Sequence, residues 1–247
     1  QGQRVVPIGR RNVRKLAPHH DGRGIDQPVE PPEDLSDLIR QHTVFFTLGE
    51  RVGTPDCHIP TCGFTWHPTR QPIALASWPV RATPDGPFTT VMSWKIEPTA
   101  PTIGGRVYGG KDVEFERFMD LPGRTPETLE VALSGAAPRA RIAAAGWRLR
   151  DAQAVSGTMA AYRDYLLGSR GECSIAKNVY VATQSGWFST RTAAYLACGK
   201  PAVVQDTGFP SHVPTGPGLH AFTTAEEAVA ALAAIRGDYA RACRHAR

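Results

Sequence analysis

The feature that most constrains this chain is an alternation of segment types that begins after Pro87. Short runs of β-branched or aromatic residues alternate with segments rich in alanine and leucine, which is typical of βα units on a parallel sheet. The expected strands are 88–94, 129–133, 147–149, 178–184, 202–205 and 219–222. The expected helices are 112–121, 138–145, 159–169, 189–198 and 225–236. We therefore predict an α/β fold, a Rossmann-like parallel sheet with helices on both faces.

Capping residues mark several helix boundaries. Asp112 is expected to open the helix 112–121, and Gly199 to end the helix 189–198. Thr223 and Thr224, followed three positions later by Glu226 and Glu227, predict a capping box for the last helix.

The chain before Pro87 has a different texture and divides in two. Residues 1–42 are rich in proline and charge and poor in apolar residues, so we expect an irregular basic arm with one short helix at 34–41. Residues 43–87 begin with the apolar run 43–48, an expected strand, and continue as a loop-rich stretch with many glycines and prolines. This second segment is a connector or a remnant of another domain, and 88–247 is the α/β domain.

Composition predicts no membrane span. Apolar residues make up 41% of the chain and charged residues 21%, which is ordinary for a globular protein, and no apolar run is long enough to cross a bilayer. The basic stretch 1–15 has no apolar segment behind it and does not resemble a secretory signal, so the cytoplasm is the expected location. The five cysteines are scattered through a chain too long to need disulfides, so reduced thiols are expected.

The net charge of +5 comes mainly from arginine. Two explanations stay open: a bias in the base composition of the gene, or an affinity for anionic ligands, since arginine binds phosphate through paired hydrogen bonds. Clustered charge with interleaved aromatic residues, which is typical of nucleic-acid binding, is only weakly present in the basic arm. A nucleic-acid partner is therefore not expected.

In a parallel sheet, ligands are expected at the carboxyl ends of the strands, where loops lead into helix N-termini that favour phosphate. Small residues in the loop before the helix 189–198 let backbone amides approach an anion, Trp187 can stack on a base, and Arg191 can neutralise a diphosphate. The alternative is that Trp187 and Phe188 only close the edge of the sheet. The candidate nucleotide-binding residues of this loop are Ser185, Gly186, Trp187, Phe188, Ser189 and Arg191.

A second candidate loop, Asp206 to Pro210, follows the strand 202–205. Asp206 can accept hydrogen bonds from sugar hydroxyls, and Gly208 permits close approach of the backbone. We predict sugar or diphosphate binding by Asp206, Thr207 and Gly208, with the ordinary turn chemistry of Asp-Thr-Gly as the alternative.

The loop after 88–94 ends in a glycine-rich stretch that matches Gly-x4-Gly-Lys from Gly105 to Lys111. A P-loop NTPase or kinase must therefore be considered, but Asp112 stands where Ser or Thr would hold magnesium. The stretch also begins about ten residues after its strand, whereas a P-loop follows the strand directly. We predict that Lys111 contacts the phosphates of the nucleotide without a P-loop.

Two histidine-containing clusters, His19-His20-Asp21 and Cys57-His58 with Cys62, do not supply four ligands at a recognised spacing. No metal site is therefore predicted. The sequence also lacks the Gly-x-Ser-x-Gly elbow of hydrolases and a Gly-x-Gly-x-x-Gly after a strand, the signature of dinucleotide oxidoreductases.

The run from Ser185 to Gly208, the stretch from Pro214 to Leu219 and the helix that begins with Glu226-Glu227 together resemble the C-terminal domain of GT-B glycosyltransferases. The similarity is greatest to an uncharacterised bacterial group whose members also carry segments like 69–72, 88–94 and 111–117. In GT-B enzymes this domain binds the nucleotide sugar, and an N-terminal domain binds the acceptor across a cleft. The resemblance implies a metal-independent transferase with a nucleotide-sugar donor, no other cofactor and an unknown acceptor. It also implies that 43–87 is the end of an acceptor-side domain and its linker.

Two departures limit what the resemblance implies. Many retaining members of the family carry a spaced pair of glutamates around this loop and helix, where Gly186 and Ala194 stand here. Retaining chemistry therefore does not follow. The family also has two Rossmann-like domains where this chain has one, so a second domain or a protein partner is expected to complete the cleft.

An inverting transferase needs a general base, for which Asp56 and His58 are the candidates. The competing hypothesis from another class is a non-catalytic module of the same fold that binds a nucleotide or a protein partner.

Overall fold

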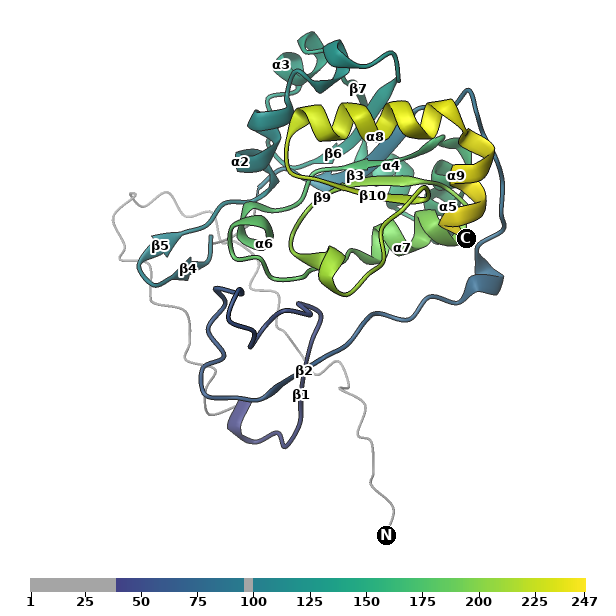
Figure 1. The fold of residues 1–247 in the computed structure, drawn as a ribbon. Helices are drawn as coiled ribbons and strands as arrows, with labels where there is room; N and C mark the ends of the chain where they lie inside the picture. The colour runs from purple at the N-terminus through teal and green to yellow at the C-terminus, as the bar shows by residue number, and fades with distance from the viewer. Residues whose placement is uncertain (1–38, 96–99) are drawn as a thin grey trace. The chain divides into compact units, whose positions relative to one another are not determined.

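The computed structural model describes residues 39–95 and 100–247, which Figure 1 draws in colour. The chain divides into two units, Gln1–His42 and Thr43–Arg247. Only residues 39–42 of the first unit are described, where the amide of His42 donates to the carbonyl of Ile39 at 2.9 Å. The predicted basic arm, its short helix and the His19-His20-Asp21 cluster therefore lie wholly or largely outside the described residues.

The second unit contains a six-stranded parallel sheet in the order β10-β9-β8-β3-β6-β7. Its strands are β3 (Phe88–Ser93), β6 (Leu129–Ser134), β7 (Arg148–Asp151), β8 (Gly171–Ser174), β9 (Ala202–Gln205) and β10 (Leu219–Phe222). The chain builds the half from β3 to β7 first and then returns to the other side of β3 to build β8, β9 and β10. This is the doubly wound order of a Rossmann fold, with the reversal between β3 and β8. The predicted fold class is confirmed.

Helices cover both faces of this sheet (Figure 1). Successive residues of β9 show the reason, because Val203 packs in one apolar cluster while Ala202 and Val204 pack in another.

No helix in the described part of the chain is long and apolar enough to cross a membrane. The helices are α2 (Lys111–Phe115), α3 (Arg139–Ala144), α4 (Ala152–Ser156), α5 (Met159–Gly168), α6 (Asn178–Ala182), α7 (Thr190–Ala197), α8 (Ala225–Gly237) and α9 (Tyr239–Ala246).

Residues 43–87 contain little regular structure. β1 (Phe45–Thr47) pairs in parallel with β2 (Trp66–Pro68), so the strand predicted at 43–48 is present but shortened. The ring of Phe45 packs against Phe64 and Trp66, with centroid distances of 4.8 and 5.6 Å. This aromatic cluster holds the two short strands together.

The strand predicted at 178–184 is wrong. That run forms the helix α6, and the fourth strand of the sheet is instead β8, whose sequence Gly-Glu-Cys-Ser carries no β-branched signal. A short apolar run such as the one after Asn178 cannot be assigned to helix or strand by periodicity alone. Because β8 is buried on both faces at the centre of the sheet, its neighbours determine its conformation more than its own propensity does.

The helix predicted at 112–121 is also corrected. α2 begins one residue earlier, with Gly110 and not Asp112 as its N-cap, and it gives way to a 3-10 helix at Glu116–Phe118. The start of α7 agrees with the prediction, because the Ser189 hydroxyl accepts a hydrogen bond from the amide of Arg191 at 3.2 Å. The sequence analysis does not predict α4 and α9: α4 is five residues long, and the buried residues of α9 are the alanines Ala242 and Ala246.

The capping box of α8 tests this part of the fold. The Thr224 hydroxyl accepts from the amide of Glu227 at 3.2 Å, and the Glu227 carboxylate accepts from the amide of Thr224 at 3.2 Å. Thr224→Ala removes the first bond and should lower the free energy of unfolding by about 1 kcal/mol in urea denaturation. Thr224→Ser keeps a hydroxyl and should cost less. Equal losses in the two variants would contradict the capping role.

Candidate functional site

A cavity of about 180 Å³ lies at the carboxyl edge of the sheet, where β8 ends at Ser174 and β9 ends at Gln205. It adjoins the reversal of strand order beside β8, the position at which open parallel sheets bind ligands. Its lining includes the charged, aromatic and hydroxyl side chains of Lys111, Lys177, Tyr180, Trp187, Arg191 and Thr207.

Lys111 reaches this cavity because of the path of the chain between β3 and α2. After β3 the chain forms a short antiparallel hairpin and returns at Gly109. The amide of Gly109 donates to Asn178 Oδ1 at 3.1 Å, and a Cβ atom on Gly109 would lie 2.1 Å from Val113 Cγ2. A side chain at this position would clash with Val113 of α2. Glycine here therefore allows Lys111 to be the first helical residue, beside the cavity.

The ammonium group of Lys111 is buried without a partner. The residue is 8% exposed, and its Nζ atom makes no hydrogen bond within the part of the chain that the structure describes. Burial lowers the pKa of this ammonium well below its ordinary value, and the charges of Arg191 and Lys177 lower it further against the opposing effect of Glu172. A buried cation without a partner is destabilising, so an anion that entered the cavity would be bound favourably.

Arg191 and Glu172 form a buried ion pair at the same edge. Arg191 Nε donates to Glu172 Oε1 at 2.6 Å, and the two terminal nitrogens donate to the Val91 carbonyl at 2.9 Å and to Ser174 Oγ at 2.5 Å. Glu172 is fully buried. Burial by itself would lower the pKa of the guanidinium, but the Glu172 carboxylate outweighs it and raises that pKa. With all three nitrogens engaged, Arg191 ties α7 to β3 and β8.

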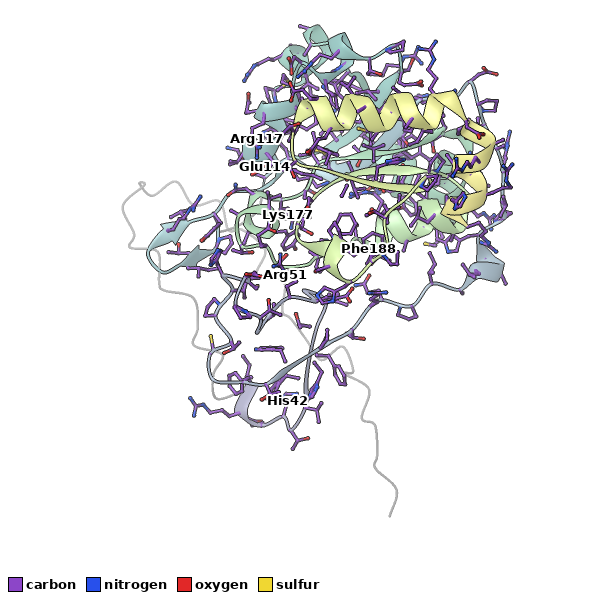
Figure 2. All side chains as sticks on the ribbon, in the orientation of Figure 1. His42, Arg51, Glu114, Arg117, Lys177 and Phe188 are labelled. Carbon is purple, nitrogen blue, oxygen red and sulfur yellow. The ribbon has the colours of Figure 1, made fainter. Side chains whose placement is uncertain are left out.

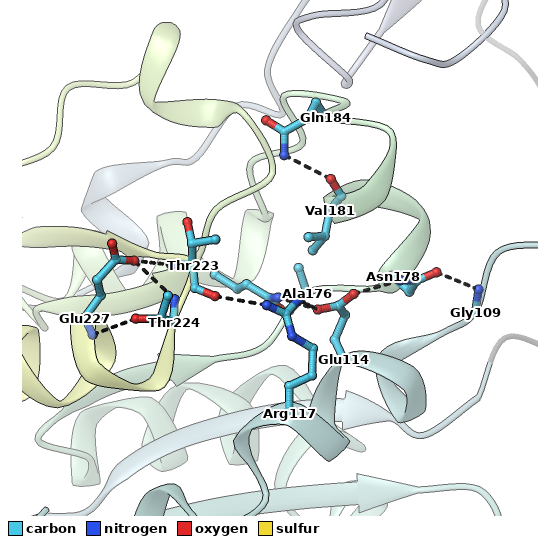
Figure 3. A network of polar contacts seen from close by, with 11 residues as sticks. Gly109, Glu114, Arg117, Ala176, Asn178, Val181, Gln184, Thr223, Thr224 and Glu227 are labelled. Carbon is cyan, nitrogen blue, oxygen red and sulfur yellow. Dashed lines mark hydrogen bonds and ion pairs between the residues drawn. The ribbon is translucent and has the colours of Figure 1, made fainter. Parts of the chain in front are cut away.

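A second buried carboxylate organises the region between α2, α6 and β9 (Figure 3). Glu114 accepts hydrogen bonds from Asn178 Nδ2 at 2.7 Å and from Arg117 Nη1 at 2.8 Å. Gln205 Nε2 donates to the same carboxylate at 2.6 Å. Arg117 also donates to the carbonyl of Thr223 at 3.3 Å, which connects the network to the segment before α8. These bonds fix the orientation of Gln205, which lines the cavity.

Two stacked rings form one wall of the cavity. The ring centroids of Trp187 and Tyr180 lie 4.9 Å apart with 17° between the planes. The ammonium of Lys177 lies 5.8 Å from the centroid of Tyr180, and Thr207 Oγ1 donates to the carbonyl of Trp187 at 2.7 Å. Lys177 and Phe188, from separate segments, both line the cavity (Figure 2). Trp187 and Phe188 therefore border the cavity at this edge of the sheet.

The cavity brings together part of the predicted site. The predicted residues that line it are Lys111, Trp187, Phe188, Ser189, Arg191 and Thr207. Ser185, Gly186, Asp206 and Gly208 are not part of the lining. The amide of Gly186 donates to the carbonyl of Thr207 at 2.7 Å, and Asp206 Oδ1 accepts from the amide of Gly208 at 2.6 Å. The second of these bonds is the ordinary turn chemistry of an Asp-Thr-Gly sequence.

Gly186 and Gly208 have a packing role. Both have positive φ, 72° and 90°, and an added Cβ would come within 2.8 Å of Arg51 at Gly186 and within 2.5 Å at Gly208. Arg51 donates to Gln184 Oε1 at 3.1 Å and forms an ion pair with Asp56 at 2.9 Å. The two glycines therefore let the segment that carries Arg51 pack on the loops beside the cavity.

The two candidates for a general base lie outside the cavity. The side chain of Asp56 is 77% exposed and pairs with Arg51, and His58 is exposed. Neither residue lines the cavity. The described lining contains no carboxylate and no imidazole.

Sequence reasoning missed several members of the site. Lys177, Tyr180 and Gln205 line the cavity, and Glu172 holds Arg191 in place. Most of these residues lie in or after β8, the region in which the strand was misplaced. Glu172 is the residue from which these neighbours could have been inferred. A carboxylate inside a buried strand requires a cation close by.

The glycine pattern before α2 does not form a P-loop. Gly104-Gly105 turns the hairpin of β4 (Thr102–Ile103) and β5 (Arg106–Val107), and Gly110 alone of these three glycines adjoins α2. A P-loop instead lies directly between a strand and its helix. Among the described residues, no group of three or more His, Cys, Asp or Glu side chains is placed to hold a metal ion.

No family model and no curated protein matches the chain. Solved structures are similar to this chain. TarM matches with a TM-score of 0.50 and 10% sequence identity, and the match covers 74% of this chain and 35% of TarM. A chain of the GtfA/B complex matches with a TM-score of 0.40 and 14% identity, and that match covers 68% of this chain and 33% of the other. The fold of this chain is GT-B-like. The chain spans about a third of the length of the structures it matches, and at these identities the likeness concerns the fold alone.

The buried ion pair provides a test of how the site is held together. Glu172→Gln leaves the Arg191 guanidinium buried beside Lys111 without a countercharge, and should lower the free energy of unfolding by roughly 3 to 5 kcal/mol in urea denaturation. The control is Glu116→Gln, which removes an ion pair with Arg141 whose side chains are 42% and 61% exposed. Its cost should stay below about 1 kcal/mol. Similar losses in the two variants would contradict the central role of Glu172.

Proposed function

We propose that this chain is the donor-binding part of a glycosyltransferase-like protein, and that the cavity at the carboxyl edge holds the diphosphate of a nucleotide sugar. The observation that carries the proposal is the buried, unpartnered ammonium of Lys111 in the lining of that cavity. Its position beside the strand-order reversal is the one expected for a ligand in this fold. The GT-B-like fold supports the same conclusion.

The charges around the cavity fit a diphosphate. Lys111, Lys177 and Arg191 line it, and Glu172 is the carboxylate that pairs with Arg191. The guanidinium is engaged in the ion pair, so Lys111 and Lys177 are the side chains that remain to contact phosphate oxygens. The amides of Gly186 and Trp187 donate to other groups of the protein. The cradle that we propose is therefore made mainly of side chains, and less of main-chain amides than the sequence predicts.

The proposed reaction is a displacement at the anomeric carbon of the sugar. A hydroxyl oxygen of the acceptor forms a bond to that carbon, and the bond from the carbon to the diphosphate oxygen breaks, with its electron pair leaving on the nucleoside diphosphate. Lysine ammonium groups stabilise the charge that develops on this leaving group without a metal ion. The proton of the acceptor hydroxyl passes to a base, which the described lining of the cavity does not include. We propose that a second domain or a protein partner on the acceptor side supplies this base. Within this chain, the candidates for the base are Asp56 and His58.

A non-catalytic binding module is the second candidate function. The observation that favours it is the lack of a carboxylate or imidazole in the described lining of the cavity. Slow hydrolysis of a nucleotide sugar by the purified chain distinguishes the two, because a module that only binds leaves the sugar conjugate intact.

Titration calorimetry with UDP, GDP and TDP tests the proposal. One of the three should bind, and Lys111→Met should weaken that binding at least tenfold, about 1.5 kcal/mol or more, by removing a charge-assisted bond to phosphate. The variant should be at least as stable as the wild type without nucleotide, because the substitution removes an unpaired buried charge. The control Arg148→Met removes an exposed cation from β7, at the other edge of the sheet. The proposal is contradicted if none of the nucleotides binds or if the two variants bind equally well.

The pH dependence of nucleotide binding gives a second test. Burial lowers the pKa of Lys111 in the free protein, and a bound diphosphate would raise it again. Binding should therefore take up protons above about pH 7.5, where the terminal phosphate is already ionised, and affinity should fall as pH rises. Calorimetry in buffers of different ionisation enthalpy measures the uptake. Lys111→Met should bind without it, and an unchanged uptake in that variant would contradict the assignment.

A further inference from the structure

A second cavity, of about 390 Å³, adjoins the first. It lies between the strands β1 and β2 and the segment that runs from α6 to α7. Its lining includes Phe46, Ile59, Trp66, Tyr180, Ser185 and Trp187. Tyr180 and Trp187 also line the first cavity, so their stacked rings are a wall common to both.

The second cavity is apolar and open to solvent. Alternation along β1 explains why Phe46 is available, since Phe45 packs into the aromatic cluster with Phe64 while Phe46 is 63% exposed at the rim of the cavity. Exposed aromatic side chains around a concave surface of this size are typical of a small-molecule site.

Two polar side chains of this lining, Trp66 and Ser185, are already engaged with the protein. Trp66 Nε1 donates to the carbonyl of Thr61 at 3.1 Å. Ser185 Oγ accepts from the amide of Trp187 at 3.3 Å and donates to the carbonyl of Tyr180 at 3.4 Å. A free sugar has hydroxyls on every side and would leave most of them without partners here. An apolar ring system with a single hydroxyl would leave at most that one hydroxyl without a partner.

Within the described lining, the hydroxyl of Tyr180 has no hydrogen-bond partner, and burial raises its pKa, so it stays neutral. It belongs to the wall between the two cavities. A ligand that directs its own hydroxyl to this wall therefore has a hydrogen-bond partner there and lies next to the site proposed for the donor.

We propose that the second cavity binds the acceptor, and that the acceptor is an uncharged alcohol or phenol with an apolar ring system. This inference rests on the proposed function, since the acceptor oxygen attacks the anomeric carbon of a donor bound in the first cavity. Because the two cavities share the wall of Tyr180 and Trp187, the acceptor hydroxyl would approach the donor past the edge of these rings.

The test uses the full chain and 2-naphthol, a neutral probe with two fused rings and one hydroxyl, with glucose as the polar comparison. In calorimetric titration 2-naphthol should bind and glucose should not. Phe46→Ser should weaken the binding of 2-naphthol by about fivefold through the loss of ring contacts. Met159→Ser, which removes a 71% exposed apolar side chain from α5, should leave it unchanged. Phe46 is itself exposed, so its variant should fold normally and should bind nucleoside diphosphate as tightly as the wild type.

The remaining outcomes overturn this inference in distinguishable ways. Failure of 2-naphthol to bind, or equal binding by the two variants, overturns the assignment of the second cavity and leaves nucleotide binding through Lys111 intact. Displacement of 2-naphthol by the nucleoside diphosphate overturns it as well, because the nucleoside base would then occupy the aromatic cavity. Binding of 2-naphthol by a chain that binds no nucleotide overturns the acceptor role together with the proposed function.

Discussion

An excess of buried positive charge at the carboxyl edge of the sheet governs the structure around it. Glu172 compensates Arg191, and that pair ties β3, β8 and α7 into one unit. Nothing in the described chain compensates Lys111 in the same way, although it is almost as deeply buried. An ammonium in that position lowers the stability of the free protein. The anion that we propose for the cavity would compensate this charge.

The doubly wound topology determines where this charge is located. The reversal of strand order beside β8 separates the loops that leave β3 and β8, and the space between them is bordered by α2 and α7. Gly109 permits the close return of the chain to α2, and the carboxylate of Glu114 fixes the relation of α2 to α6 and β9. The stacked rings of Tyr180 and Trp187 then divide a charged cavity from an apolar one. One short stretch of chain, from α6 to α7, thus borders two environments of opposite chemistry.

Much of the fold follows from the sequence, because local signals and tertiary demands agree there. The strands β9 and β10, the helix that follows Ser189 and the capping box of Thr224 are present as predicted. The prediction failed at β8, a central strand without β-branched residues, and with it were missed Glu172 within the strand and Lys177 just beyond it. Their importance depends on partners distant in sequence, such as Arg191, and no local pattern reveals such a partner. Lys111 was singled out from a glycine-rich stretch that was not expected to form a P-loop; the structure forms none there and places Lys111 in the cavity lining, and its contact with phosphate stays a prediction.

The most direct test of the central claim is a crystal structure with UDP, GDP or TDP soaked into the protein. The account predicts diphosphate oxygens within about 3.2 Å of Lys111 Nζ, in the cavity bordered by Lys177 and Trp187, with the pair of Arg191 and Glu172 undisturbed. A diphosphate bound at the turn from Asp206 to Gly208, or on the surface with the cavity empty, would contradict it.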